Sequence, residues 1–235
     1  MSDRKTESLT TSERLAAFLS GHRKLLLIIG ALMLVSIFGA VVIYQVYDSR
    51  MESAARAAEL LSQDWEEWQR LNRAEDGDPA SALETRIRNR AQATIQDYPR
   101  SYGALRSLHI LSMLEWELEN YDALHETALE LVERFPRSHL AGTALVNAAA
   151  ASEEMNDRAE ARRLLERVAA GEGGPTLEKA RALFNLGRLA EEEGSPGEAL
   201  DYYNRLVEEH PDSNWTSLGR NRIIWLSSRG LGAES

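Results

Sequence analysis

Two nearly identical stretches, DYPRS at 97–101 and RFPRS at 134–138, place prolines 37 residues apart in a chain that has only six. Proline lacks a backbone donor and clashes with the preceding turn, so it ends an α-helix. Gly173 and Pro211 continue the series at further intervals of 37 and 38 residues. Three nearly equal intervals predict a structural repeat, and a repeat of this length explains most of the chain with one kind of unit.

Residues 180–213 form the clearest copy of this unit and predict two helices joined by a turn at 194–197. Apolar and small residues recur at spacings of three and four, as on one face of a helix. They are Leu183, Leu186, Gly187 and Ala190 in the first segment and Ala199, Tyr203 and Leu206 in the second. The pattern resembles the tetratricopeptide repeat. Small residues such as Gly187 and Ala199 are expected to let the paired helices approach closely.

Weaker copies of the hairpin occupy 105–138 and 142–175, and an atypical pair with a longer loop occupies 51–98. A closing helix at 217–230 is expected to cover the last apolar face, because a stacked array must cap its ends to stay soluble. We therefore predict an all-α fold. It comprises about four hairpins in a short right-handed, tetratricopeptide-repeat-like α-solenoid.

The segment 25–47 has no charged residue. A helix of this length spans about 34 Å, enough for a hydrocarbon core of about 30 Å. The long apolar run, followed by DSRMES in place of a small-residue cleavage site, indicates a retained transmembrane helix and not a cleaved signal peptide. Basic residues are concentrated before it, so the positive-inside rule predicts that residues 1–24 are cytoplasmic and 48–235 lie across the membrane. In a bacterium this would be an inner-membrane protein with a periplasmic domain.

Two smaller features flank this segment. Residues 11–24 carry an amphipathic pattern with Leu15, Phe18 and Leu19 on its apolar side. They predict a short helix in the cytoplasmic tail that lies on the inner leaflet, contacts a partner or only sets the topology. No helix breaker separates the apolar run from 51–73, and one hypothesis is that the two form a continuous helix.

Composition excludes several functions. The chain has no cysteine, which excludes disulfides and thiolate chemistry. Five of its 27 basic and three of its 37 acidic residues precede residue 48. Residues 48–235 therefore carry a net charge of −12, which disfavours nucleic-acid binding. HETAL at 125–129 has leucine where a zinc-protease helix needs its second histidine. The acidic run 191–193 is typical of a solvated helix end, so we expect no enzymatic activity, metal or cofactor.

Protein binding is the better expectation, because in tetratricopeptide arrays the first helix of each hairpin lines a concave groove. The matching positions here are Arg106, His109, Met113 and Trp116; Thr143, Val146, Ala150 and Glu153; and Arg181, Phe184, Arg188 and Glu191. Arg181, Phe184 and Arg188 share a helical face and are suited to hold an extended or acidic peptide. The alternative is that this is an ordinary surface with a partly buried Phe184. Trp116 is likewise either a binding residue or a residue that only packs against its neighbours.

Three stretches carry a further resemblance: ERLAAFLSGHRKLLL at 13–27, the segment 53–61 and YGALRSL at 102–108. With the order of the parts, they make the chain similar to the YfgM-like ancillary SecYEG translocon subunit family. The resemblance implies an inner-membrane scaffold whose periplasmic repeats associate with the translocon and with a membrane-anchored periplasmic chaperone. It also implies assistance to client proteins emerging from the channel, and no catalytic residues.

Two other interpretations stay open. The P-R-S and P-D-S terminators also resemble the repeats of periplasmic proteins that act in envelope assembly, so the chain is alternatively an adaptor in envelope assembly or cell division. An array that mainly self-associates is the other alternative.

Overall fold

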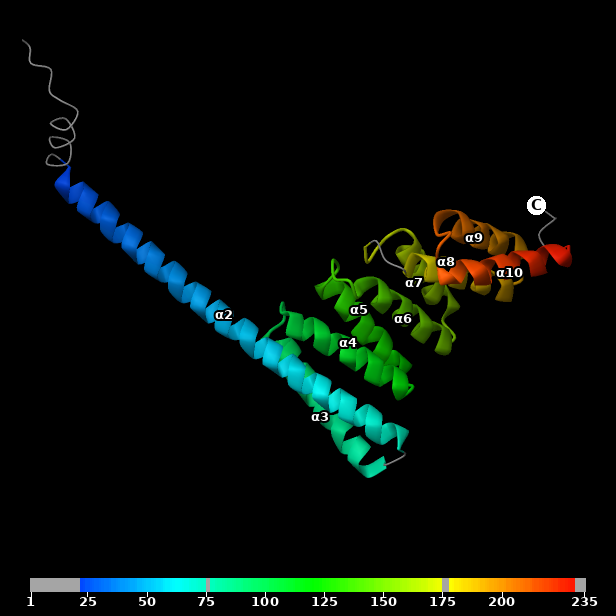
Figure 1. Cartoon of the computed structure of the whole chain (residues 1–235), viewed down its shortest axis with the longest axis horizontal. Helices are drawn as coiled ribbons and strands as arrows, with labels where there is room; N and C mark the ends of the chain where they lie inside the picture. The colour runs from blue at the N-terminus through cyan, green and yellow to red at the C-terminus, as the bar shows by residue number, and fades with distance from the viewer. Residues whose placement is uncertain (1–21, 75–76, 175–177, 231–235) are drawn as a thin grey trace, which may run out of the picture. The chain divides into compact units, whose positions relative to one another are not determined.

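The computed structural model describes residues 22–74, 77–174 and 178–230, and the elements assigned there are all α-helices (Figure 1). The chain divides into two units, residues 1–52 and 53–235. The first unit contains the beginning of α2 (Arg23–Arg73), which runs without a break, as the absence of a helix breaker indicated. The helix includes a stretch long and apolar enough to cross a membrane. The amphipathic segment expected in the tail lies, as far as Gly21, outside the described residues.

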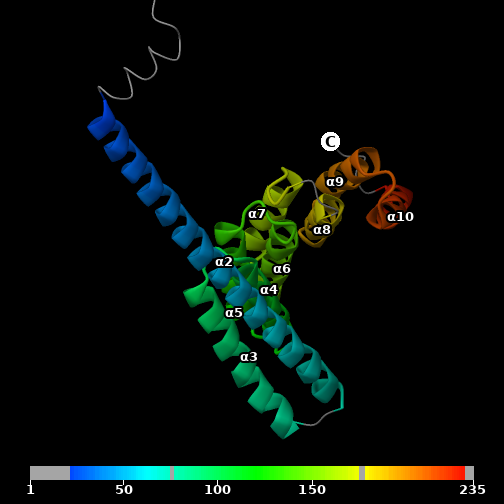
Figure 2. The same ribbon diagram turned by 60° about the vertical axis from the view of Figure 1, so that its left-hand side comes forward.

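The second unit is a series of helical hairpins followed by a single helix. Its elements are α2 from Ser53 onward with α3 (Gly77–Asp97), α4 (Tyr102–Glu117) with α5 (Tyr121–Arg134), α6 (Ala141–Glu154) with α7 (Arg158–Ala169), α8 (Glu178–Glu192) with α9 (Pro196–Glu209), and α10 (Asn214–Ser228). From α3 to α10 each helix contacts the next (Figure 2), and the first helices α4, α6, α8 and α10 also contact one another in order. The predicted all-α solenoid of tetratricopeptide-like hairpins is confirmed.

The prolines of the repeat lie just beyond the helices that they end. Pro99, Pro136 and Pro211 each stand two residues after the last residue of α3, α5 and α9. The proline ring cannot continue a helix, and it also disfavours helical backbone at the residue before it. Phe135 and His210, which precede two of the prolines, accordingly have φ of −131° and −134° with ψ of 55°. The common position explains why the three prolines keep nearly the same register in the repeat.

The serines that follow these prolines differ in role. Ser101 caps α4, because its Oγ accepts a hydrogen bond from the backbone N–H three residues on, at 3.0 Å. Ser213 caps α10 in the same way, through the N–H two residues on, at 3.3 Å. Such caps satisfy backbone donors that have no partner inside the helix. Ser138 makes no such cap, since the N-cap of α6 is Leu140.

Gly173, expected to stand in for a proline, does something else. The helix before it, α7, already ends at Ala169, and Gly173 has a φ of +86°, which favours glycine. A Cβ added here would lie 2.5 Å from the backbone nitrogen of Gly142. The interpretation of Gly173 as a helix terminator is therefore wrong: glycine is needed because two backbone segments touch.

Two helical glycines let neighbouring helices touch. A Cβ added at Gly103 in α4 would lie 2.5 Å from the carbonyl oxygen of Ala54 in α2. A Cβ at Gly187 in α8 would lie 2.5 Å from the ring of Tyr203, which is fully buried in α9. The close approach expected at Gly187 is confirmed, and the glycine of the YGAL stretch has a steric explanation.

The first hairpin has an aromatic core of its own. Trp65 and Trp68 of α2 stack with ring centroids 5.1 Å apart. Trp68 is buried and donates a hydrogen bond from Nε1 to Glu84 of α3 at 3.3 Å, so its polar edge is satisfied. Asp64, also buried, pairs with Arg90 of α3 at 3.0 Å. These contacts fasten α2 to α3 within the second unit.

Candidate partner-binding face

The first helices of the hairpins meet around a hollow of about 360 Å³, which we call the Trp116 hollow. It is lined by Trp65 and Gln69 of α2, Ser112, Met113, Trp116 and Glu117 of α4, Asn147 and Ala150 of α6, and Arg181 of α8. Four of the predicted groove positions, Met113, Trp116, Ala150 and Arg181, are thus brought together from three helices. The hollow offers apolar walls, two amides and one guanidinium in the same space.

Trp116 is the most accessible aromatic of this hollow, with 44% of its surface exposed. Its ring meets that of Tyr121 edge-on, with centroids 6.1 Å apart, which holds the indole without burying it. Arg181 lies 3.7 Å from Glu178, a loose contact on its own helix. The hollow thus contains an exposed aromatic ring and an arginine, two residue types that are enriched at protein–protein interfaces.

Arg106 and His109 lie outside this hollow, although they were predicted to share the groove with Met113 and Trp116. Arg106 donates a hydrogen bond from Nε to Ser62 of α2 at 3.4 Å. Burial lowers the pKa of His109, and the charges of Arg106 and His139 lower it further. The imidazole is therefore neutral at physiological pH and contributes no charge to partner recognition.

Thr143 and Val146 of α6 make contacts inside the array. The Thr143 hydroxyl donates a hydrogen bond to Glu178 of α8 at 3.1 Å. Val146 is 1% exposed and belongs to the central apolar core. Its side chain is therefore almost inaccessible to a partner.

Glu153 and Arg188 pair with each other between α6 and α8, and Arg188 also binds Glu192 at 2.6 Å. The two opposite charges on neighbouring first helices neutralise each other, so Arg188 is already occupied by carboxylates. Of the two arginines predicted to hold an acidic peptide, Arg181 is the one left with only a loose partner.

Phe184 is half-buried among aromatic rings. Its centroid lies 5.7 Å from that of Tyr203 and 5.3 Å from that of Trp215. This packing supports the alternative interpretation of Phe184 as part of the structural surface, and the ring helps to join α8, α9 and α10.

Glu191 connects three helices. It accepts a hydrogen bond from the Tyr203 hydroxyl at 2.7 Å and one from Arg222 Nε of α10 at 2.9 Å. Burial acts to raise the pKa of Glu191, but the hydrogen bonds from Arg222 and Tyr203 outweigh it, and the net pKa lies below the ordinary value. Burial and the hydrogen bond to Glu191 raise the pKa of Tyr203. Glu191 thus acts inside the array, at what we call the Glu191 junction.

The other two carboxylates of the acidic run are exposed, as expected, and both are ion-paired. Glu192 lies 3.4 Å from Arg158, and Glu193 lies 2.5 Å from Arg162, both arginines being on α7. The run is therefore part of the contact between the third and fourth hairpins. Sequence reasoning missed this role because the arginines lie about thirty residues away along the chain.

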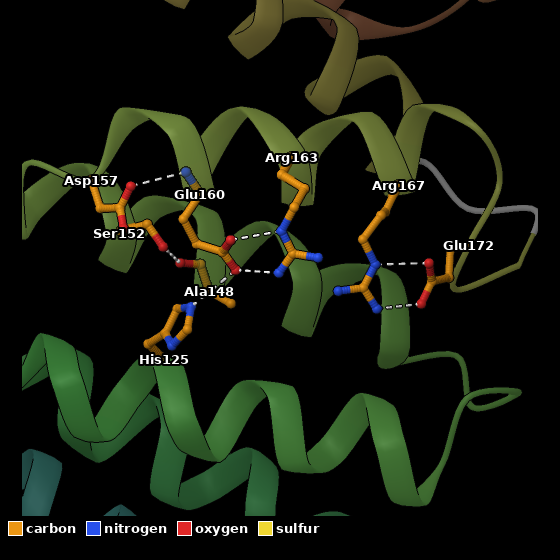
Figure 3. A network of polar contacts seen from close by, with 8 residues as sticks. All are labelled: His125, Ala148, Ser152, Asp157, Glu160, Arg163, Arg167 and Glu172. Carbon is orange, nitrogen blue, oxygen red and sulfur yellow. Dashed lines mark hydrogen bonds and ion pairs between the residues drawn. The ribbon is translucent and has the colours of Figure 1, made fainter.

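His125, the histidine of the HETAL stretch, belongs to a polar network between α5 and α7 (Figure 3). Its Nε2 lies 3.6 Å from Glu160, which also accepts two hydrogen bonds from Arg163, at 2.7 and 2.6 Å. The hydrogen bond from Arg163 is the main reason that the pKa of Glu160 is lowered. Arg167 and Glu172 form a second such pair one turn further along.

Trp65 and Gln69 line the hollow from α2, a helix for which no groove positions were predicted. Trp65 lies on the apolar stripe by which α2 packs in the first hairpin, with 7% of its surface exposed. The available signal was Gln69, one turn later on the same helical face. A stripe that becomes polar marks the edge of a core, and that edge lines the hollow.

Comparisons with known proteins found matches for parts of the chain. Residues 146–214 match the family model described as Tetratricopeptide repeat. A TPR repeat-containing protein of Treponema pallidum (strain Nichols) is 38% identical over 98 residues, which cover 42% of this chain and 40% of that protein. A solved structure, titled Crystal structure of MamA, aligns with a TM-score of 0.49 and 17% identity over 71% of this chain and 86% of its own. The family model thus identifies tetratricopeptide repeats within residues 146–214, whereas the narrower resemblance to the YfgM-like family stays a prediction.

Proposed function

We propose that this chain is a membrane-anchored, non-enzymatic scaffold that holds partner proteins in the Trp116 hollow. Tetratricopeptide repeats indicate protein–protein interaction, and proteins built from them are generally non-catalytic. The observation that carries the proposal is the convergence of Met113, Trp116, Ala150 and Arg181 around one accessible space.

The chemistry of the hollow suits an extended segment of a partner. Such a segment has backbone groups without hydrogen-bond partners, and Gln69 and Asn147 supply both donors and acceptors. An apolar side chain of the segment would contact Met113, whose flexible thioether adapts to different shapes, and the exposed Trp116. The expected occupant is a short unfolded stretch with one large apolar residue.

We further propose that the partners are translocon subunits, a periplasmic chaperone or client peptides emerging from the channel. The long apolar stretch of α2 and the sequence resemblance to the YfgM-like family support this proposal. The anchor would lie in the inner membrane of a bacterium, with the N-terminus in the cytoplasm and the repeats in the periplasm. An adaptor in envelope assembly is the alternative, supported by the proline-serine terminators, two of which cap helices.

Site-specific photo-crosslinking in the native membrane tests the proposal. A photoreactive amino acid at position 116 should capture a partner, while one at the exposed position 208 on α9 should not. Identifying the captured proteins separates translocon and chaperone from envelope-assembly components. Equal capture at 116 and 208 would exclude the hollow as the binding site.

A matched pair of substitutions tests the contribution of Trp116. Trp116→Ala should reduce capture at a neighbouring probe position, because it removes the largest accessible apolar surface of the hollow. Tyr102→Ala removes another exposed aromatic from the same helix, at a position outside the hollow, and should leave capture unchanged. Replacing the anchor by an unrelated transmembrane helix should abolish association with the translocon if the membrane segment contributes contacts.

A further inference from the structure

The last helix, α10, exposes an unusual surface for this acidic protein. Of the large apolar side chains that are exposed in the described part of the second unit, half lie on this helix: Leu218 at 46%, Ile224 at 67% and Trp225 at 36%. Residues 214–230 contain three arginines and no acidic residue, whereas the chain beyond residue 47 carries a net charge of −12. Apolar surface and positive charge thus coincide where the rest of the domain is negative.

The arginines flank the apolar side chains. At 3.6 residues per turn, the nine positions from Arg220 to Arg229 correspond to about two and a half turns, so the two side chains lie on opposite flanks of the exposed face. Leu218, Ile224 and Trp225 fall between them. We call this set of five residues the α10 face.

The charges on both flanks are available. Among the residues that the structure describes, no carboxylate pairs with Arg220 or Arg229, whereas Arg222 is committed to Glu191. The guanidinium groups of Arg222 and Arg229 lie 4.4 and 4.2 Å from the centre of the Trp225 ring, which holds the indole in place by cation–π attraction. The face is therefore held in shape before anything binds to it.

The repeat shows what ordinarily covers part of this face. A shift of 37 residues superimposes α10 on α8: it places Gly219 and Leu226 at the positions of Ala182 and Leu189, and all four are buried. In α8 the positions that face α9 include Leu183, fully buried. The same position in α10 is Arg220, exposed. A helix covering α10 would therefore need a carboxylate where α9 offers apolar contact.

We propose that the α10 face is a second docking surface, separate from the Trp116 hollow, for an acidic amphipathic segment of a partner protein. The segment's apolar side chains contact Leu218, Ile224 and Trp225, and its carboxylates pair with Arg220 on one flank and Arg229 on the other. Charge complementarity selects this occupant over a basic segment, which would meet two arginines that no described carboxylate neutralises.

A defined peptide tests the proposal on the full chain in phosphatidylcholine nanodiscs. The probe is a fluorescein-labelled peptide of repeated Leu-Leu-Glu-Glu units, followed by fluorescence anisotropy. We expect binding that weakens about tenfold in the double variant Arg220→Gln/Arg229→Gln, the loss expected for two ion pairs, and similarly in Trp225→Ala. The control Arg100→Gln/Arg137→Gln removes two exposed arginines from turns elsewhere and should bind as the unchanged chain does.

Other outcomes would overturn the proposal. Equal weakening in both double variants would show non-specific charge attraction, and equal binding of a Leu-Leu-Lys-Lys peptide would exclude recognition of carboxylates. Displacement of the peptide when phosphatidylglycerol is added to the nanodiscs would make a lipid surface the occupant. If the chain self-associates and Trp225→Ala abolishes this self-association, the occupant of the α10 face would be a second copy of the chain. Loss of peptide binding in Trp116→Ala would assign the peptide to the hollow.

Discussion

The helices α6 and α10 have almost the same length but differ in how they are buried. In α6, nine of 14 residues are buried, mostly alanines, because helices pack against it on several sides. In α10, three of 15 are buried, because only α8 and α9 contact it among the described helices. In a stacked array each unit is stabilised by its neighbours. Burial therefore differs with the number of neighbours, and α10 has a face that no other described helix covers.

The largest expected effect concerns a leucine in the middle of the array. Leu145 in α6 is fully buried, whereas Leu218 in α10 is 46% exposed. Leu145→Ala should lower the free energy of unfolding by about 2–5 kcal/mol through lost burial and a cavity, and Leu218→Ala by no more than about 0.5 kcal/mol. Urea unfolding of the detergent-solubilised chain, followed by circular dichroism, gives both values. A similar loss of unfolding free energy in Leu145→Ala and Leu218→Ala would contradict the proposed difference between α6 and α10.

The second prediction asks whether α8, the first helix of the fourth hairpin, is packed as tightly as the middle of the array. Gly187→Ala should destabilise the chain by about 1–3 kcal/mol, because the added Cβ would overlap the buried Tyr203 ring. Gly197→Ala is the matched control, since nothing lies within 4 Å of the Cβ added there. The same unfolding experiment applies, and a tolerated Gly187→Ala would show that the ring has room to move.

The third prediction concerns the attachment of α10 through the Glu191 junction. Glu191→Gln should lower the free energy of unfolding at neutral pH by about 1 kcal/mol, the usual size for a partly buried hydrogen-bonded group. Because the folded pKa of Glu191 lies below its ordinary value of 4.5, the stabilisation is present above that pH and is lost as the pH falls through the folded pKa. The difference between the two proteins should therefore shrink below about pH 4.5. A difference that does not change with pH would count against the junction.

The smallest expected effect is at the surface, where middle and end should not differ. Arg163 in α7, 57% exposed, pairs with Glu160 one turn away. Arg163→Ala should cost about 0–1 kcal/mol, and less at high salt, because exposed ion pairs are screened. Arg205→Ala in α9 removes another surface pair, with Glu209, in which both side chains are 46% exposed, and should behave alike. A large difference between the two variants would indicate a structural role for the network around Glu160.

Local chemistry made much of the fold predictable. Pro99, Pro136 and Pro211 mark helix ends because proline acts on its own helix, whatever surrounds it. Gly173 lies at the spacing of the repeat but does not end a helix as the prolines do. A glycine can end a helix or permit a close approach of two segments, and only the distance to Gly142 distinguishes the two roles. The role of Gly103 depended in the same way on a backbone almost fifty residues earlier.

The candidate site was less predictable than the fold. The repeat determines which positions face the groove, but the side chains on adjacent helices determine whether a residue at such a position is free to contact a partner. The register placed Met113, Trp116 and Arg181 on one side of the array, where they surround the hollow. It also selected Arg188 and Glu191, whose charges are taken up by carboxylates and hydrogen-bond donors on adjacent helices. Ion pairing between segments far apart in the chain has no signature in a single helix.

The Glu191 junction bears on how the array comes apart. A row of units that touch only their neighbours can unzip from its free end, one helix at a time. Here one carboxylate holds the hydroxyl of α9 and the guanidinium of α10 together, so peeling off α10 would strip that carboxylate of its cation and uncover the buried Tyr203 beside it. Helices α8 to α10 should therefore unfold and refold together as one cooperative unit.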